Sequence, residues 1–228
     1  QVGISYYPKW SRCSIAELGQ TIRRLRQEFG KEVIIVETAY PWTTDGNDSA
    51  GNILEHDSLV PEYPATLSGQ KRFLIELTQT VIANDGMGVV YWEPAWVSSD
   101  AKTRWGKGSH WENNAFFDFK QTNAHTGFDF FTHPYVEPKP FTFQFEAESE
   151  FPGETVYFWS DIFNDKAFVV PLTRTGKTYE FTMLVMPNQE FRFMLFKDNT
   201  RKQPIIMNVN GKAVGSSAGS VMKAIIQH

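Results

Sequence analysis

The chain has 228 residues, which is enough to bury a full hydrophobic core in one large domain or two ordinary ones. Its formal net charge of −4 gives no electrostatic reason to bind a polyanion, so we expect no nucleic-acid partner. The sequence has a single cysteine, Cys13, which excludes an intrachain disulfide. It contains no apolar stretch of about 18 residues, the length needed to span a membrane. Its seven Trp lie mostly between Trp10 and Trp111, and clustered indoles favour a partner with flat apolar faces, such as a sugar.

The first third of the chain predicts a strand, a helix and a second strand. Residues 2–7 predict a short strand. A helix follows, because Ser14 and Glu17 form a capping box and apolar residues recur at helical spacing as far as Gly30. Residues 33–36 are an unbroken β-branched run, which is typical of a strand buried on both faces in a parallel sheet.

A second helix and a third strand continue the alternation. Ser68 is expected to cap a helix that ends at residues 84–86, and residues 87–91 predict another buried strand. The order β-α-β-α-β, with long loops after the strands, indicates a barrel or doubly wound sheet with its active site in the βα loops.

The pattern changes near residue 137, where a Pro-rich stretch precedes an alternating apolar and polar run at residues 141–148. Period-two alternation predicts antiparallel sheet, and regularly spaced runs of this kind predict a small β-sandwich. We therefore expect a first domain over residues 1–136 and an accessory β domain over residues 137–228. The further strands are expected at residues 156–159, 167–172, 179–185, 190–196 and 205–209.

Glu37 is the first candidate catalytic residue, because it directly follows a buried strand, where barrel strands present their catalytic groups. A salt bridge at the strand end would explain the same carboxylate without catalysis. Residues 37–42 and 91–96 place acidic and aromatic groups at two successive strand ends. This combination suits a site that grips a sugar and stabilises an oxocarbenium-like transition state.

Four segments, in this order, resemble the endo-β-1,4-galactanases of glycoside hydrolase family 53: Ile4–Pro8, Val36–Trp42, Val90–Trp96 and Gly108–Phe119. The resemblance covers about residues 1–133. It implies a (β/α)8 barrel, of which this chain would hold strands six, seven and eight. It also implies retaining hydrolysis of β-1,4-linked galactan, the galactose side chain of pectin.

The resemblance also assigns roles to individual residues. It makes Glu37 the nucleophile. Tyr6 and Tyr7, at the end of the preceding strand, are candidates for orienting Glu37 or the sugar by hydrogen bonding, although only one of the two can point inward from a regular strand. The expected sugar-stacking surface has Trp92 at the cleavage subsite, extended by Trp42 and Trp96, with loop packing as the alternative for each indole.

The chain departs from the family in its second carboxylate. The family's acid/base Glu lies on strand four and follows an Asn, whereas no Asn-Glu pair occurs in this sequence, and Glu93 is a poor substitute. We therefore expect a fragment or part of a longer polypeptide that is inactive alone and needs the N-terminal barrel half as a partner. The polymeric substrate predicts a secreted or cell-envelope protein.

A calcium site is a second expectation, because residues 45–52 alternate oxygen-bearing side chains within a Gly-containing loop. The loop is an incomplete match to an EF-hand, which ends in Glu. Calcium sites in some bacterial family members imply the ligands Asp45, Asn47, Ser109 and Glu112, and the alternative is an Asx-rich surface turn that binds nothing.

Two other functions stay open on the sequence. One is a non-catalytic glycan-binding protein whose β-sandwich carries the binding, with Trp159 as its aromatic residue. The other is a related barrel glycosidase that cleaves a different β-linked polysaccharide with the same type of carboxylate pair.

Overall fold

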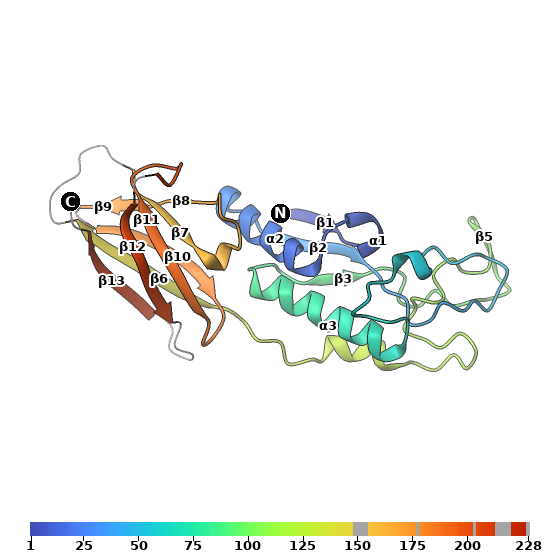
Figure 1. The fold of residues 1–228 in the computed structure, drawn as a ribbon. Coiled ribbons are helices and arrows are strands. Elements are labelled where there is room, and N and C mark those ends of the chain that lie inside the picture. Colours follow the sequence, from blue (N-terminus) through green and yellow to red (C-terminus); the bar gives the residue numbers. More distant parts are fainter. Residues whose placement is uncertain (148–154, 177, 203, 213–219, 227–228) are drawn as a thin grey trace. The chain divides into compact units, whose positions relative to one another are not determined.

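The computed structural model describes residues 1–147, 155–176, 178–202, 204–212 and 220–226. The chain divides into two compact units (Figure 1). The first unit comprises residues 1–19, 31–82 and 86–135, and the second comprises residues 20–30, 83–85 and 136–228. The expected division at residues 136 and 137 assigned all earlier residues to the first domain, whereas residues 20–30 and 83–85 belong to the second unit.

The first unit contains a parallel sheet of three strands, β1 (Val2–Ser5), β2 (Val33–Thr38) and β3 (Val89–Tyr91), in the order β1-β2-β3. Val2 pairs with Val33, and Ile35 pairs with Val89. The carboxyl ends of parallel strands meet at one edge of the sheet, so the loops after the strands lie near one another. The shorter elements of this unit are α1 (Pro8–Ser11), η1 (His56–Ser58), β4 (Lys102–Thr103), β5 (Gly106–Lys107) and η2 (Thr126–Phe131).

Helix α2 (Ile15–Phe29) begins and ends as its sequence predicts. The backbone N–H of Ser14 donates to Glu17 Oε2 over 2.7 Å, and the N–H of Glu17 donates to Ser14 Oγ over 3.2 Å, which completes the capping box. Gly30 follows the helix with a φ of 60°, a left-handed conformation that glycine adopts without steric cost.

Helix α3 (Leu67–Ala83) begins two residues earlier than a Ser68 cap would place it, and Ser68 is not its cap. Thr66 Oγ1 accepts a hydrogen bond from the N–H of Gly69 over 3.0 Å, so the capping residue is Thr66. Gly69 is required at this position, because a Cβ atom there would lie 1.9 Å from the carbonyl oxygen of Pro64. The chain can turn sharply from Pro64 into the helix only where this side chain is absent.

One face of the parallel sheet is open, contrary to the expectation that its strands are buried on both faces. Val33 and Ile35 are fully buried, whereas the side chains of Val36 and Val90 are 42% and 49% exposed. Among the described residues, β1 and β3 pair with no strand beyond β2, so the sheet also has two open edges. The β-branched run therefore has one buried face, and its other face, which carries Val36, is not covered by the described residues.

The second unit has two four-stranded sheets, with the orders β13-β6-β10-β9 and β12-β11-β7-β8. Phe143 of the first sheet and Phe158 and Phe193 of the second are fully buried in one aromatic core. The last strand, β13, was not predicted, and it pairs in parallel with β6. The strands and the short helix are β6 (Lys139–Ala147), β7 (Tyr157–Ser160), η3 (Asp161–Phe163), β8 (Val170–Pro171), β9 (Thr173–Thr175), β10 (Thr178–Val185), β11 (Glu190–Phe196), β12 (Pro204–Lys212) and β13 (Ser220–Ile226).

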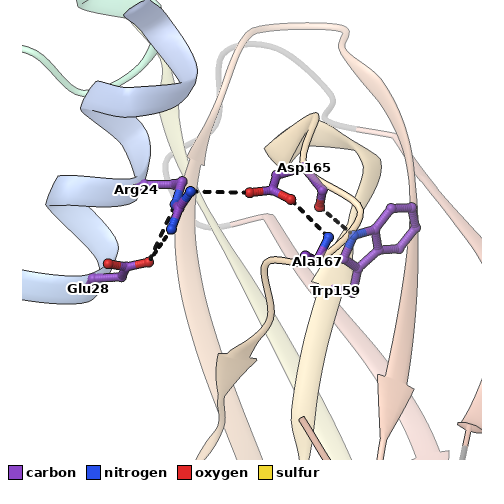
Figure 2. A network of polar contacts seen from close by, with 5 residues as sticks. All are labelled: Arg24, Glu28, Trp159, Asp165 and Ala167. Atoms are coloured by element: carbon purple, nitrogen blue, oxygen red, sulfur yellow. Dashed lines mark hydrogen bonds and ion pairs between the residues drawn. The ribbon is translucent and has the colours of Figure 1, made fainter. Parts of the chain in front are cut away.

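The C-terminal part of α2 joins the second unit through two arginines. Arg23 is buried and donates to the carbonyl oxygens of Ala83, over 2.9 Å, and Leu184, over 3.1 Å. Arg24 lies between Glu28, at 3.2 Å, and Asp165, at 3.4 Å (Figure 2). Because the buried guanidinium satisfies the carbonyls of Ala83 and of Leu184 on β10, residues 20–30 are fixed within this unit by hydrogen bonds as well as by packing.

Trp159 also belongs to this network. Its indole N–H donates to the carbonyl oxygen of Asp165 over 3.0 Å, and Asp165 Oδ1 accepts from the N–H of Ala167 over 2.8 Å (Figure 2). The polar edge of the half-buried ring is therefore used inside the unit, and this arrangement does not favour Trp159 as a free sugar platform.

None of the helices in the described ranges has the length and apolar character that a membrane-spanning helix requires.

Candidate functional site

The candidate site centres on Glu37, which lies near the carboxyl end of β2. The hydroxyl of Tyr7 donates a hydrogen bond of 2.7 Å to Glu37 Oε1. Tyr7 comes just after β1, the parallel neighbour of β2, and the N–H of Tyr6 donates to the carbonyl oxygen of Glu37 over 2.8 Å. Adjacent parallel strands therefore bring the phenol and the carboxylate together.

The two neighbouring tyrosines have different roles. The hydroxyl of Tyr6 donates to the carbonyl oxygen of Cys13 over 3.0 Å, and its ring stacks on Phe73 with centroids 6.5 Å apart. Alternation along the strand thus directs Tyr7 toward Glu37 and Tyr6 into the core. Burial and, second, the hydrogen bond to Glu37 raise the pKa of the Tyr7 phenol above its ordinary value of 10, so it stays protonated and donates.

Trp92 lies at the next strand end, directly after β3. The residue is 39% exposed, and its backbone N–H donates to the carbonyl oxygen of Thr38 over 2.8 Å. The ring meets the edge of buried Trp111 at a centroid distance of 6.4 Å, and Trp111 in turn lies 6.1 Å from Tyr7. An exposed apolar face is therefore connected to the Glu37–Tyr7 pair through Trp111, a residue that the sequence had not marked as part of the site.

Trp42 and Trp96 contact a different set of residues. Trp42 is half-buried and packs against Phe119, at a centroid distance of 5.0 Å, and His125, at 5.4 Å. The carbonyl oxygen of Trp96 accepts a hydrogen bond of 2.5 Å from Ser109 Oγ. Both residues join the loops after β2 and β3 to the segment over residues 109–125. Neither has a ring contact with Trp92 or Tyr7 among the contacts of the described residues.

A buried polar network holds the loops after β2 and β3. The side-chain amide of Gln70, on α3, donates to the carbonyl oxygens of Tyr40, over 2.7 Å, and Asn114, over 2.9 Å. The hydroxyl of Tyr91 donates to the same Asn114 oxygen over 2.7 Å. Buried backbone carbonyls need such partners, so Gln70 and Tyr91 determine where the loop after Glu37 runs. Their contacts are tertiary, and no local sequence signal identified them.

The loop expected to bind calcium surrounds Glu112, which is fully buried. Glu112 Oε1 accepts a hydrogen bond of 2.5 Å from the N–H of Asn47, whereas Glu112 Oε2 has no partner among the described residues. Asn52 Oδ1 is also buried and has no hydrogen-bond partner in the described part of the chain. Both side chains lie beside Gly46, where a Cβ atom would be 3.4 Å from Glu112 Oε1 and 3.6 Å from Asn52 Nδ2.

The other expected ligands are placed less favourably for a cation. The side chain of Asp45 is exposed, Ser109 Oγ donates to Trp96, and the amide of Asn47 donates to the carbonyl oxygen of Phe119 over 3.2 Å. Asp48, which the sequence analysis had not selected, accepts from the N–H of Ser109 over 2.8 Å. No group of three or more His, Cys, Asp or Glu side chains that could hold a metal occurs among the described residues.

Comparison with known proteins gives consistent results for the first unit. The family profile described as glycosyl hydrolase family 53 matches residues 1–131. An arabinogalactan endo-beta-1,4-galactanase of Cellvibrio japonicus (strain Ueda107) is 51% identical over 135 residues, which are 59% of this chain and 36% of the relative. An endo-beta-1,4-galactanase of Bacillus subtilis (strain 168) is 28% identical over 130 residues, which cover 53% of this chain and 30% of the relative.

A solved structure, the Ignisphaera aggregans GH53 catalytic domain, superposes with a TM-score of 0.53 at 29% identity. The superposition covers 58% of this chain and 38% of that structure. The chain thus spans about a third of the length of the relatives that it matches.

Proposed function

Because this chain belongs to glycosyl hydrolase family 53, whose profile matches residues 1–131, we propose that it is part of an endo-β-1,4-galactanase. Its parallel sheet is part of a TIM barrel, the fold of its solved relative. The substrate proposed is β-1,4-linked galactan of the arabinogalactan type, which is the polymer named for the Cellvibrio japonicus relative.

The hydrogen bond between Tyr7 and Glu37 is the observation that carries this proposal. In a retaining mechanism, Glu37 attacks the anomeric carbon and the galactosyl unit becomes bonded to the carboxylate, while the leaving oxygen takes a proton from a second carboxyl. Water then releases the sugar. Tyr7 holds Oε1 and so fixes the rotation of the carboxylate, which leaves Oε2 to form the bond.

The second carboxyl group is proposed to come from the N-terminal half of the barrel, outside the 228 residues of this chain. The two carboxyls of a retaining glycosidase are about 5 to 5.5 Å apart, so the missing group must approach the Glu37 end of the sheet. The exposed faces of Val36 and Val90, together with the open edges of β1 and β3, are where such a segment would pack and pair. We also propose that the protein acts outside the cell or in the cell envelope, where its polymeric substrate is found.

Calcium is proposed as a structural ion at Glu112. Two buried oxygens without partners, Glu112 Oε2 and Asn52 Oδ1, suit a hard cation, which binds carboxylate and amide oxygens. The ion would supply charge to offset the buried carboxylate and would take no part in the chemistry. The ligand set proposed here retains Glu112 and has Asn52 in place of Asp45, Asn47 and Ser109.

The experiment that tests the function measures galacto-oligosaccharide release from β-1,4-galactan. It compares this chain, the complete polypeptide, and the complete polypeptide with Glu37→Gln or, as a matched control, Glu93→Gln. We expect cleavage by the complete protein and by Glu93→Gln, and none by this chain or by Glu37→Gln. Equal cleavage by Glu37→Gln would show that Glu37 is structural, and cleavage of mannan or xylan in place of galactan would show a different substrate.

A further inference from the structure

Trp10 is an exposed indole next to the Tyr7–Glu37 hydrogen bond, and no role for it follows from the sequence motifs or from the family. It lies on α1, the single helical turn that begins at Pro8, right after Tyr7. Its side chain is 50% exposed, and its ring meets that of Tyr7 edge to face, with centroids 4.9 Å apart. Since the Tyr7 hydroxyl binds Glu37, the indole lies one aromatic ring away from the proposed nucleophile.

The turn that carries Trp10 is fixed at both ends. Lys9 Nζ donates to Asp57 Oδ1 and to the carbonyl oxygen of Ile53, each over 2.9 Å. The N–H of Tyr7 donates to Ser11 Oγ over 3.0 Å. The backbone that carries the exposed ring is therefore held in place, and a preorganised aromatic residue loses less conformational entropy when it binds a ligand.

Ring contacts connect Trp10 to Trp92 through Tyr7 and Trp111. The two middle rings are buried, whereas the two outer indoles are exposed. Tyr7, whose hydroxyl binds Glu37, therefore lies between the two exposed indoles in this series of ring contacts. A polymer that is cut in its interior needs contacts on both sides of the bond that breaks.

We propose that Trp10 is a substrate-binding residue that stacks on one galactose ring of β-1,4-galactan, on the opposite side of Glu37 from the ring held by Trp92. This inference rests on the proposed function and extends it from the nucleophile to chain-length specificity. Each exposed indole takes one sugar ring, so substrates that reach both indoles are cleaved faster than shorter ones.

The test uses the complete polypeptide and measures kcat/KM for galacto-oligosaccharides of increasing length. Trp10→Ala is compared with Trp105→Ala, because Trp105 is also exposed, at 66%, but lies between β4 and β5 and contacts Arg104. We expect Trp10→Ala to lose about 10- to 100-fold in kcat/KM on the longer substrates, the typical effect of removing a binding Trp, and to lose its preference for them. Trp10→Phe, which keeps a flat ring, should retain most of the activity.

The inference is overturned if Trp10→Ala and Trp105→Ala have the same length dependence, or if Trp10→Ala lowers Tm and leaves that dependence unchanged. The second result would mean that another segment of the complete protein covers Trp10. If the wild-type polypeptide releases nothing from galactan or its oligosaccharides, the proposed function fails first, and this inference fails with it.

Discussion

The phenol of Tyr7 donates to the carboxylate of Glu37 over 2.7 Å, although 30 residues separate the two in sequence. The contact exists because β1 and β2 are parallel neighbours and end at the same edge of the sheet. Tyr7 is therefore a positioning residue for the proposed nucleophile.

Replacing Tyr7 with Phe in the complete polypeptide should lower kcat about 10- to 100-fold, because a hydrogen bond to a charged group contributes about 1.5 to 3 kcal/mol. KM should change little, since the bond is made to the nucleophile and not to the sugar. Tyr6→Phe is the matched control, because its hydroxyl donates to Cys13 and not to Glu37. Steady-state kinetics that show equal losses in both variants would contradict the role given to Tyr7.

Replacing Gln70 with Met should destabilise the fold by about 2 to 4 kcal/mol, because the carbonyl oxygens of Tyr40 and Asn114 lose a buried donor. Gln121→Met, at an exposed position, should change stability by less than about 0.5 kcal/mol. Denaturant unfolding of the complete polypeptide measures both. A loss at Gln70 no larger than that at Gln121 would mean that the network does not hold the loops.

Acid should weaken the segment around His125. Burial lowers the pKa of this imidazole from its ordinary value of 6.5, and the neutral ring already accepts from the N–H of Gly127 over 3.0 Å. The unfolded chain binds the proton of this imidazole more tightly than the folded chain does, so stability is lost as the pH falls from about 6.5 toward the lower pKa of the folded state. His125→Gln should flatten the pH dependence of the unfolding free energy below about pH 6.5. A variant with the wild-type slope would remove His125 as the cause.

Calcium should raise Tm through Glu112. Burial raises the pKa of this carboxyl above its ordinary value of 4.5, so without a cation the stability it provides falls as the pH rises through the folded pKa. A bound cation would prevent this loss of stability, and removing the cation with EDTA should bring the loss back. Glu112→Gln should abolish the calcium response, whereas exposed Asp45→Asn should keep it. A response that depends on Asp45 would favour the ligands first expected from sequence.

Local sequence patterns identified the features whose causes are local. The capping box of Ser14 and Glu17 forms as expected, because both partners lie within one helical turn. Thr66 and Ser68 are equally good caps by composition, and the sharp approach of Pro64 to Gly69 selects Thr66. In the same way, strand alternation predicted that one of two tyrosines points inward, and the pairing of β1 with β2 shows which one.

The residues that sequence reasoning missed make their contacts across large separations. Trp111 joins the site through Tyr7 and Trp92, and Gln70 binds loops that are far from it in the chain. The β-branched run at residues 33–36 reads as buried on both faces, but the chain's described residues leave Val36 exposed. Periodicity indicates that a face is apolar and gives no information on which segment covers it.

Because the sheet has two open edges among the described residues, a barrel made from two separate fragments would form its active site only when the fragments associate. If β1 to β3 are strands six to eight of the proposed barrel, a segment that ends in strand five would pair with β1 and its first strand would pair with β3, so that two fragments would complete the proposed catalytic centre. Galactan cleavage in such a mixture should then rise with the concentration of each fragment, and it should be half-maximal when the free fragment in excess is near the dissociation constant of the pair.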